Sequence, residues 1–206
     1  GNADKHRLVE LITANLAQTA NGAITICNAV GQSQLRKPAP ETIAGSRTRP
    51  VLKIQDGCNA ACTYCIVPLA RGPSRSLPPN DVIAAVRAVS EAGFHEIVLS
   101  GIHLGHYGHD LTPGTNLGEL LVRIEQSTVV PRLRLSSLEP LEITDELIER
   151  MTESPRLCHH FHIPLQSGDD LILKKMRRPY TSDEFKQLVF RIHDRIPDAA
   201  IGADIL

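Results

Sequence analysis

The chain has 206 residues, of which 42% are apolar and 3% aromatic, and its formal net charge is -1 at pH 7. This length is enough for one large domain, or for one domain with part of another. No apolar run is long enough to cross a membrane and the first residues lack the layout of a secretory signal, so we expect a cytoplasmic protein without a membrane partner. The near-neutral charge argues against a basic nucleic-acid-binding surface over the whole chain.

The first 49 residues are predicted to be the end of a preceding unit and a linker. Residues 3–19 carry apolar side chains at helical spacing, and residues 23–30 form a short apolar stretch. Residues 31–50 are polar and rich in Pro, Gly and Ser, which is typical of a linker. We therefore expect the main domain to occupy residues 50–206.

From residue 51 onward, apolar runs typical of strands alternate with amphipathic helical patterns. Strands are expected at residues 51–55, 96–101, 132–140, 159–168 and 199–206. Helices are expected at residues 78–93, 116–127, 144–154, 169–176 and 182–195. Asn80 and Thr144 are the expected N-caps of the first and third of these helices. The alternation predicts an α/β fold with parallel strands and right-handed crossovers, in which chemistry takes place where strands end.

Three of the five cysteines lie in one short loop directly after the first expected strand. They are Cys58, Cys62 and Cys65, in the segment "CNAACTYC", whereas Cys27 and Cys158 lie far away in the sequence. Four thiolates would complete a zinc site or occupy every iron of a [4Fe–4S] cluster, so three leave one iron open for a small ligand. Two alternatives remain at this point: a zinc site whose fourth ligand is a histidine of residues 158–162, and three incidental thiols.

The spacing Cys-x3-Cys-x2-Cys, with Tyr64 before the last cysteine, resembles the radical S-adenosylmethionine (SAM) superfamily. That resemblance implies that the three thiolates bind three irons of a [4Fe–4S] cluster, and that the fourth iron takes the amino and carboxylate groups of SAM. One electron from the cluster then releases a 5′-deoxyadenosyl radical, which abstracts hydrogen from a substrate. The implied fold is a partial (β/α) radical SAM barrel, truncated at the fifth strand.

Longer motifs resemble one branch of that superfamily. The segments "CNAACTYCIVPLARGPSRS", "VLSGIHLGHYG", "RLSSLEP" and "HFHIPLQSGDD" are similar to the tRNA threonylcarbamoyladenosine methylthiotransferases. This branch converts N6-threonylcarbamoyladenosine at tRNA position 37 to its 2-methylthio derivative. Other methylthiotransferase substrates, namely a differently modified adenosine or a protein side chain, and a non-catalytic, zinc-stapled RNA-binding module are the alternatives.

Members of this family carry an N-terminal domain with a second [4Fe–4S] cluster and a small C-terminal β domain. By that comparison residues 1–49 are the end of the N-terminal domain, and residues 50–206 are an incomplete radical SAM core. Cys27 alone cannot build the second cluster. We therefore expect a fragment that binds the SAM cluster weakly and does not complete methylthiolation.

The resemblance also implies contacts to SAM or substrate at the ends of successive strands. The residues concerned are Tyr64, Ser100, Gly101, His103, Ser136, Glu139, Gln166, Ser167 and Arg178. Tyr64 would lie near the adenine, because an aromatic ring can stack on it. For the others, core packing, helix capping and solvated charge are the competing interpretations.

The expected partners are tRNA and an electron-donor protein. Arg71 and Arg75, with Arg47 and Arg49, are candidate phosphate contacts near the mouth of the site, and ordinary surface charge is the alternative. The segment "CHHFH" places Cys158, His160 and His162 on one face of a strand, which would suit a second metal, although the resemblance implies none there.

Overall fold

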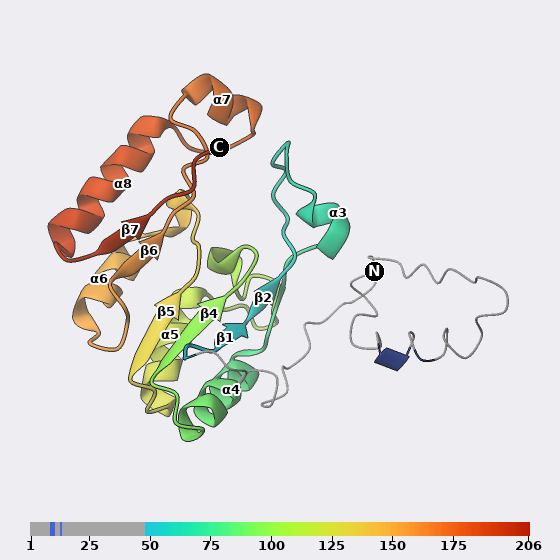
Figure 1. The fold of residues 1–206 in the computed structure, drawn as a ribbon, viewed down its shortest axis with the longest axis vertical. Coiled ribbons are helices and arrows are strands. Elements are labelled where there is room, and N and C mark those ends of the chain that lie inside the picture. The colour runs from blue at the N-terminus through green and yellow to red at the C-terminus, as the bar shows by residue number, and fades with distance from the viewer. Residues whose placement is uncertain (1–8, 11–12, 14–47) are drawn as a thin grey trace.

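The computed structural model describes residues 9–10, 13 and 48–206 (Figure 1). Its strands are β1 (Val51–Lys53), β2 (Gln55–Asp56), β3 (Arg75–Ser76), β4 (Glu96–Ser100), β5 (Arg132–Leu135), β6 (His160–His162) and β7 (Ala200–Gly202). The predicted helix at residues 3–19 lies almost wholly outside the described residues, as do the stretch at 23–30 and most of the linker.

The five strands predicted from the sequence run parallel and follow one another in chain order. In the first sheet β4 pairs with β1 on one side and with β5 on the other, and β6 pairs with β7 in another sheet. A parallel bridge between Leu133 and Leu157 joins the end of the first sheet to the segment that leads into β6. The predicted α/β fold with parallel strands is therefore confirmed, and the strands form no closed barrel within the described part of the chain.

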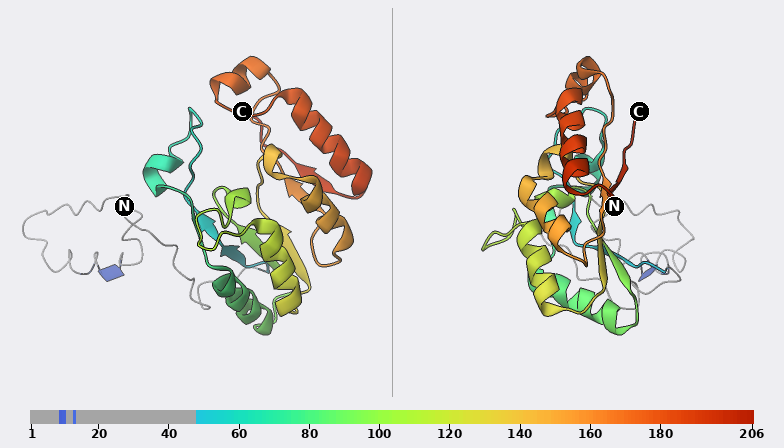
Figure 2. Two further views of the ribbon diagram at one scale, coloured as in Figure 1. Left: turned by 180° about the vertical axis from the view of Figure 1, so that it is seen from behind. Right: turned by 90° about the vertical axis from the view of Figure 1, so that its left-hand side faces the viewer.

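Helices connect these strands. They are α3 (Val67–Arg71), α4 (Pro79–Glu91), α5 (Leu117–Ser127), α6 (Asp145–Glu153), α7 (Asp170–Lys175) and α8 (Ser182–Arg195), with short 3₁₀ turns η2 (Leu104–His106) and η3 (Pro140–Glu142). In the edge-on view of Figure 2, α4, α5, α6 and α8 lie on one side of the strands. The core fills the space between them and includes the fully buried Leu52, Leu99 and Leu133, so the loops at the strand ends rest on a rigid base.

Local signals explain most helix starts. The Thr144 side chain accepts a hydrogen bond from the backbone of Leu147 at the start of α6, as predicted. The prediction for Asn80 is wrong: α4 begins at Pro79 with Pro78 as its N-cap. Proline suits the first helical position because its φ is already helical and it needs no hydrogen-bond partner there.

The strand predicted at residues 51–55 is divided in two. β1 ends at Lys53, and β2 pairs antiparallel with β3, which the sequence did not predict. The change of partner occurs at Ile54, which is fully buried. The β2–β3 hairpin therefore carries the chain from the parallel sheet into the cysteine loop and back.

Across the described residues, no helix has both the length and the apolar character needed to span a bilayer.

Candidate functional site

The cysteine loop begins at Gly57, a position that only a residue without a side chain can occupy. Gly57 has φ +75°, and a Cβ there would lie 2.0 Å from the carbonyl oxygen of Pro73. The next residue, Cys58, donates its backbone N–H to Gly72 O at 3.1 Å. The backbone of Cys58 is therefore fixed against Gly72, the C-cap of α3.

The far part of the loop is anchored to a distant segment of the chain. Thr63 donates its backbone N–H to Met176 O at 3.2 Å and its hydroxyl to Lys175 O at 3.0 Å. These carbonyls lie at the end of α7, which follows the fourth parallel strand. The loop after the first strand and the loop after the fourth are thus joined directly.

His103 lies against the first cysteine. Its Nδ1 is 3.3 Å from Cys58 Sγ, and its Nε2 is 2.6 Å from a carboxylate oxygen of Glu142. Its backbone N–H donates to the side-chain oxygen of Gln55 at 2.8 Å. The end of β4, the η3 turn and β2 therefore position this imidazole together.

These contacts change the protonation of both groups. Burial raises the pKa of the Cys58 thiol, but the hydrogen bonds with His103 and the backbone of Ala60, together with the charge of His103, lower it by more, so that the pKa lies below its ordinary value. Burial lowers the pKa of His103, but its contacts with Cys58 and Glu142 raise the pKa to about 10. A thiolate beside an imidazolium is the protonation state in which a cysteine binds iron.

Arg178 makes the corresponding contacts at the second cysteine. Its guanidinium, only 4% exposed, donates to Cys62 Sγ and to the Tyr64 hydroxyl, each at 3.4 Å. It also forms an ion pair with Glu139 and donates to the Tyr180 hydroxyl at 3.1 Å. Burial lowers the pKa of Arg178, but Glu139 beside it raises that pKa further, so the side chain stays charged.

Ser136 has a hydroxyl that a ligand could use, whereas the close approach at Gly101 is to another protein side chain. Ser136, at the end of β5, has a buried hydroxyl oxygen without a hydrogen-bond partner among the described residues. A buried hydroxyl needs such a partner, and a ligand would supply one. Gly101 follows Ser100 at the end of β4, and a Cβ there would lie 2.8 Å from the Gln55 side-chain oxygen. The close approach at Gly101 is therefore to Gln55, where the sequence had suggested a ligand.

Gln166 and Ser167 are not brought to the cysteines by any contact found in the described part of the chain. Gln166 has φ 66° and donates its backbone N–H to Asp204 O at 2.9 Å, beside the end of β7. The Ser167 hydroxyl accepts from the backbone of Asp169 at 3.2 Å. Ser167 thus shapes the turn before α7, as the capping interpretation expects.

The arrangement of the thiols bears on the choice between zinc and an iron–sulfur cluster. Four ligands on one zinc ion place their sulfurs about 3.8 Å apart, given Zn–S bonds of about 2.3 Å. Within the described residues, one group of three possible ligand atoms lies within 4.8 Å, formed by His103, His106 and Glu142, so the three cysteine sulfurs do not converge to that extent. In a [4Fe–4S] cluster each thiolate binds a different iron, and this donor set fits such a cluster.

The side chains of the segment "CHHFH" do not belong to any group of three possible ligand atoms within 4.8 Å of one another among the described residues. His159 contacts Asp198 at 3.0 Å, and His162 contacts Ser137 at 2.7 Å. Cys158 is buried, and burial raises the pKa of its thiol. Partners thus account for His159 and His162, whereas His160 Nδ1 is buried without a hydrogen-bond partner among the described residues.

Arg75 is not the exposed phosphate contact that the sequence suggested. Its side chain is buried and forms an ion pair with Asp56, which also pairs with Arg71 at 3.3 Å. Arg49 pairs with Glu96 at 3.6 Å, and Arg47 lies outside the described residues. Arg71 and Arg75 therefore stabilise the base of the cysteine loop through Asp56.

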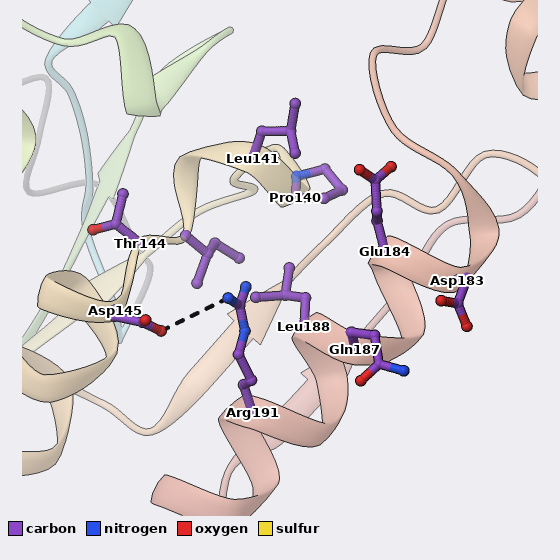
Figure 3. A pocket seen from close by; sticks show the side chains of 10 residues that line it. Pro140, Leu141, Thr144, Asp145, Asp183, Glu184, Gln187, Leu188 and Arg191 are labelled. Atoms are coloured by element: carbon purple, nitrogen blue, oxygen red, sulfur yellow. Dashed lines mark ion pairs between the residues drawn. The ribbon is translucent and has the colours of Figure 1, made fainter.

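A pocket of about 400 Å³ lies between η3 and α8, on the helical side of the strands (Figure 3). Arg191 of α8 reaches toward Asp145 across it, at 3.9 Å, and Leu188 forms part of its wall. None of the predicted site residues lines this pocket.

The fold and the cysteine loop define a radical SAM protein, and comparison with known sequences agrees. The radical SAM superfamily profile matches residues 52–206, and the chain belongs to that superfamily. The threonylcarbamoyladenosine tRNA methylthiotransferase MtaB of Bacillus subtilis is 42% identical over 192 residues, covering 92% of this chain and 41% of that protein. MtaB of Thermotoga maritima is 39% identical over 178 residues, covering 84% of this chain and 41% of that protein. The chain thus spans about two fifths of these curated relatives.

Other relatives carry a different substrate in their names. The tRNA-2-methylthio-N(6)-dimethylallyladenosine synthase of Thermoanaerobacter sp. (strain X514) is 39% identical over 150 residues, covering 73% of this chain and 32% of that protein. The resemblance to tRNA methylthiotransferases read from the motifs is therefore confirmed.

Solved structures support the fold alone. TsrM from Kitasatospora setae, a radical SAM methyltransferase with tryptophan and a SAM analogue bound, has a TM-score of 0.57 at 16% identity, covering 76% of this chain and 30% of that one. The cobalamin-dependent radical SAM enzyme OxsB also has a TM-score of 0.57 at 16% identity, covering 75% of this chain and 23% of that one.

Sequence reasoning missed two members of the site. Glu142 and Gln55 both contact His103, but neither stands in a motif with the cysteines. The one sequence signal for Glu142 is its position three residues after Glu139, because that spacing is typical of a capping box.

Proposed function

We propose that this chain is the cluster-binding part of a radical SAM methylthiotransferase that converts N6-threonylcarbamoyladenosine, beside the tRNA anticodon, to its 2-methylthio derivative. The observation that carries the proposal is that two of the other motif segments are joined to the cysteine loop, one directly and one through Arg178. His103 of "GIHLGHYG" contacts Cys58, and Arg178, paired with Glu139 of "RLSSLEP", contacts Cys62.

In this proposal Cys58, Cys62 and Cys65 hold a [4Fe–4S] cluster, and SAM binds beside it. When bound, the cluster supplies the electron that cleaves SAM and so yields the hydrogen-abstracting 5′-deoxyadenosyl radical. The chain's own residues hold and shield the reactants. The proposal assigns to SAM a hydrogen bond from the Ser136 hydroxyl, which has no partner among the described residues, and stacking of its adenine on the Tyr64 ring, which is 46% exposed.

The remaining predicted contacts stay proposals: Ser100, Gly101, Gln166 and Ser167 as neighbours of SAM. The same holds for a second [4Fe–4S] cluster in the full-length protein, for an electron-donor protein, and for a cytoplasmic location beside the tRNA substrate. That this chain alone does not complete methylthiolation is likewise a prediction.

The relatives named for dimethylallyladenosine support a second candidate substrate, at 39% identity for the Thermoanaerobacter protein. The MtaB match extends over more of this chain, 192 residues against 150, and this favours threonylcarbamoyladenosine.

Mass spectrometry of tRNA nucleosides from a strain lacking the gene separates the two substrates. We expect 2-methylthio-threonylcarbamoyladenosine to disappear, with its unmodified precursor accumulating, while the methylthiolated dimethylallyl nucleoside persists. Complementation by the unaltered gene should restore the product, and complementation by the Cys62→Ala gene should not. Unchanged 2-methylthio-threonylcarbamoyladenosine in the deletion strain would refute the proposed substrate.

A further inference from the structure

Two of the three cysteines of the loop each have a side-chain nitrogen within hydrogen-bond distance of the sulfur, and each of these nitrogen-bearing side chains is held by a carboxylate from the same short segment. Glu142 contacts His103, which contacts Cys58 Sγ. Glu139 pairs with Arg178, which contacts Cys62 Sγ. The two chains of contacts are built alike although they come from different strand ends.

The η3 turn links the Glu142–His103–Cys58 contacts to the Glu139–Arg178–Cys62 contacts. Glu139 is its N-cap and Glu142 its third residue, and the backbone N–H of Glu139 donates to a Glu142 carboxylate oxygen at 3.0 Å. This capping box holds the Glu139 and Glu142 carboxylates on one turn. A displacement of one carboxylate therefore also disturbs the other.

The donors of Arg178 are committed to the protein. Its three guanidinium nitrogens donate to Cys62 Sγ and Tyr64, to Glu139, and to Tyr180. With its side chain 4% exposed, Arg178 is poorly placed to grip a ligand carboxylate directly. Both ring nitrogens of His103 likewise face acceptors, a thiolate on one side and a carboxylate on the other.

We propose that His103 and Arg178 are hydrogen-bond donors to the cluster thiolates, which raise the reduction potential of the cluster, and that Glu139 and Glu142 position them. The inference rests on the proposed function, because it requires that the cysteines bind a [4Fe–4S] cluster. Hydrogen bonds to the sulfurs and nearby positive charge stabilise the more negative, reduced cluster. Hydrogen bonds from His103 and Arg178 to the two sulfurs therefore favour acceptance of the electron that the reaction needs.

The test is a mediated redox titration of the anaerobically reconstituted 206-residue chain without SAM, followed by electron paramagnetic resonance. Arg178→Gln and His103→Gln should each lower the midpoint potential at unchanged iron content. The double variant should lower the midpoint potential more than either single variant, and the departure from the sum of the two shifts measures their coupling through Glu139 and Glu142. Arg178→Lys, which keeps the charge but loses the planar fork, should shift the potential less than Arg178→Gln and serves if the glutamine variant does not fold.

Arg150→Gln is the matched control. Arg150 also forms an ion pair with a glutamate, Glu125, but joins α6 to α5 and touches no cysteine. Its removal should leave the midpoint potential unmoved. Loaded clusters whose potentials match the unaltered chain, or an equal shift in the control, would overturn this inference and leave the proposed function standing. An unaltered chain that takes up no iron would overturn the proposed function and this inference with it.

Discussion

Replacing Gly57 by alanine tests how tightly the start of the cysteine loop is fixed. A Cβ at this position would lie 2.0 Å from Pro73 O, so the two atoms must separate by about 1 Å to reach the 3.0 Å below which such contacts are essentially never seen. The φ of +75° adds about 1–2 kcal/mol for a residue with a side chain. The shift also breaks the hydrogen bond from Cys58 to Gly72, worth about 1 kcal/mol.

Together these effects predict a loss of about 2–3 kcal/mol in the free energy of unfolding, which a domain of ordinary stability survives. The displaced loop should bind markedly less iron. Urea unfolding measures the first quantity, and iron content after anaerobic reconstitution measures the second. Gly93→Ala is the control, because Gly93 has φ +88° but nothing within 4 Å of its Cβ position. If both variants lose equal stability and both load iron fully, the close approach at Gly57 does not fix the loop.

Three further predictions test the fold. Tyr107→Phe should cost about 1–2 kcal/mol in thermal or urea unfolding, because the buried hydroxyl donates to Leu77 O at 2.7 Å and its loss leaves that carbonyl unpaired; an unchanged stability would contradict this. Burial raises the pKa of Glu96, but hydrogen bonds from two arginines outweigh burial and lower it. The stability that Glu96 contributes is therefore present above its unfolded pKa near 4.5 and is lost as the pH falls below that value. Glu96→Gln should consequently make the free energy of unfolding fall less steeply at acid pH. An unaltered dependence on pH would refute the assignment. Asn116→Ala should cost about 1 kcal/mol as the loss of an N-cap, whereas Asn80→Ala, inside its helix and exposed, should cost less than half of that; equal costs would contradict the observed helix starts.

The fold was largely predictable because its main signals are local. The strands and helices after residue 50 follow from apolar periodicity, and Thr144 caps its helix as expected. The start of α4 was misplaced because two prolines precede Asn80, and a proline at the first helical position sets the boundary by its own φ. The β2–β3 hairpin escaped prediction because each strand has two residues and the pairing depends on tertiary contacts.

The sequence singled out the cysteine loop and the residues His103 and Arg178 that contact it, but not Gln55 and Glu142, which hold His103. The spacing of Cys58, Cys62 and Cys65 carries its own chemical meaning, whereas the contacts of Gln55 and Glu142 with His103 join residues far apart in sequence. Arg75 shows the converse error: a basic residue near a loop looks exposed in sequence, and only the tertiary structure shows it buried against Asp56.

Quantification of iron and acid-labile sulfide after anaerobic reconstitution tests the central claim most directly. The account predicts a brown protein that binds roughly four irons and four sulfides per chain, with both lost in Cys62→Ala. A colourless protein that binds one zinc ion instead, or a Cys62→Ala variant that keeps its full iron, would contradict it.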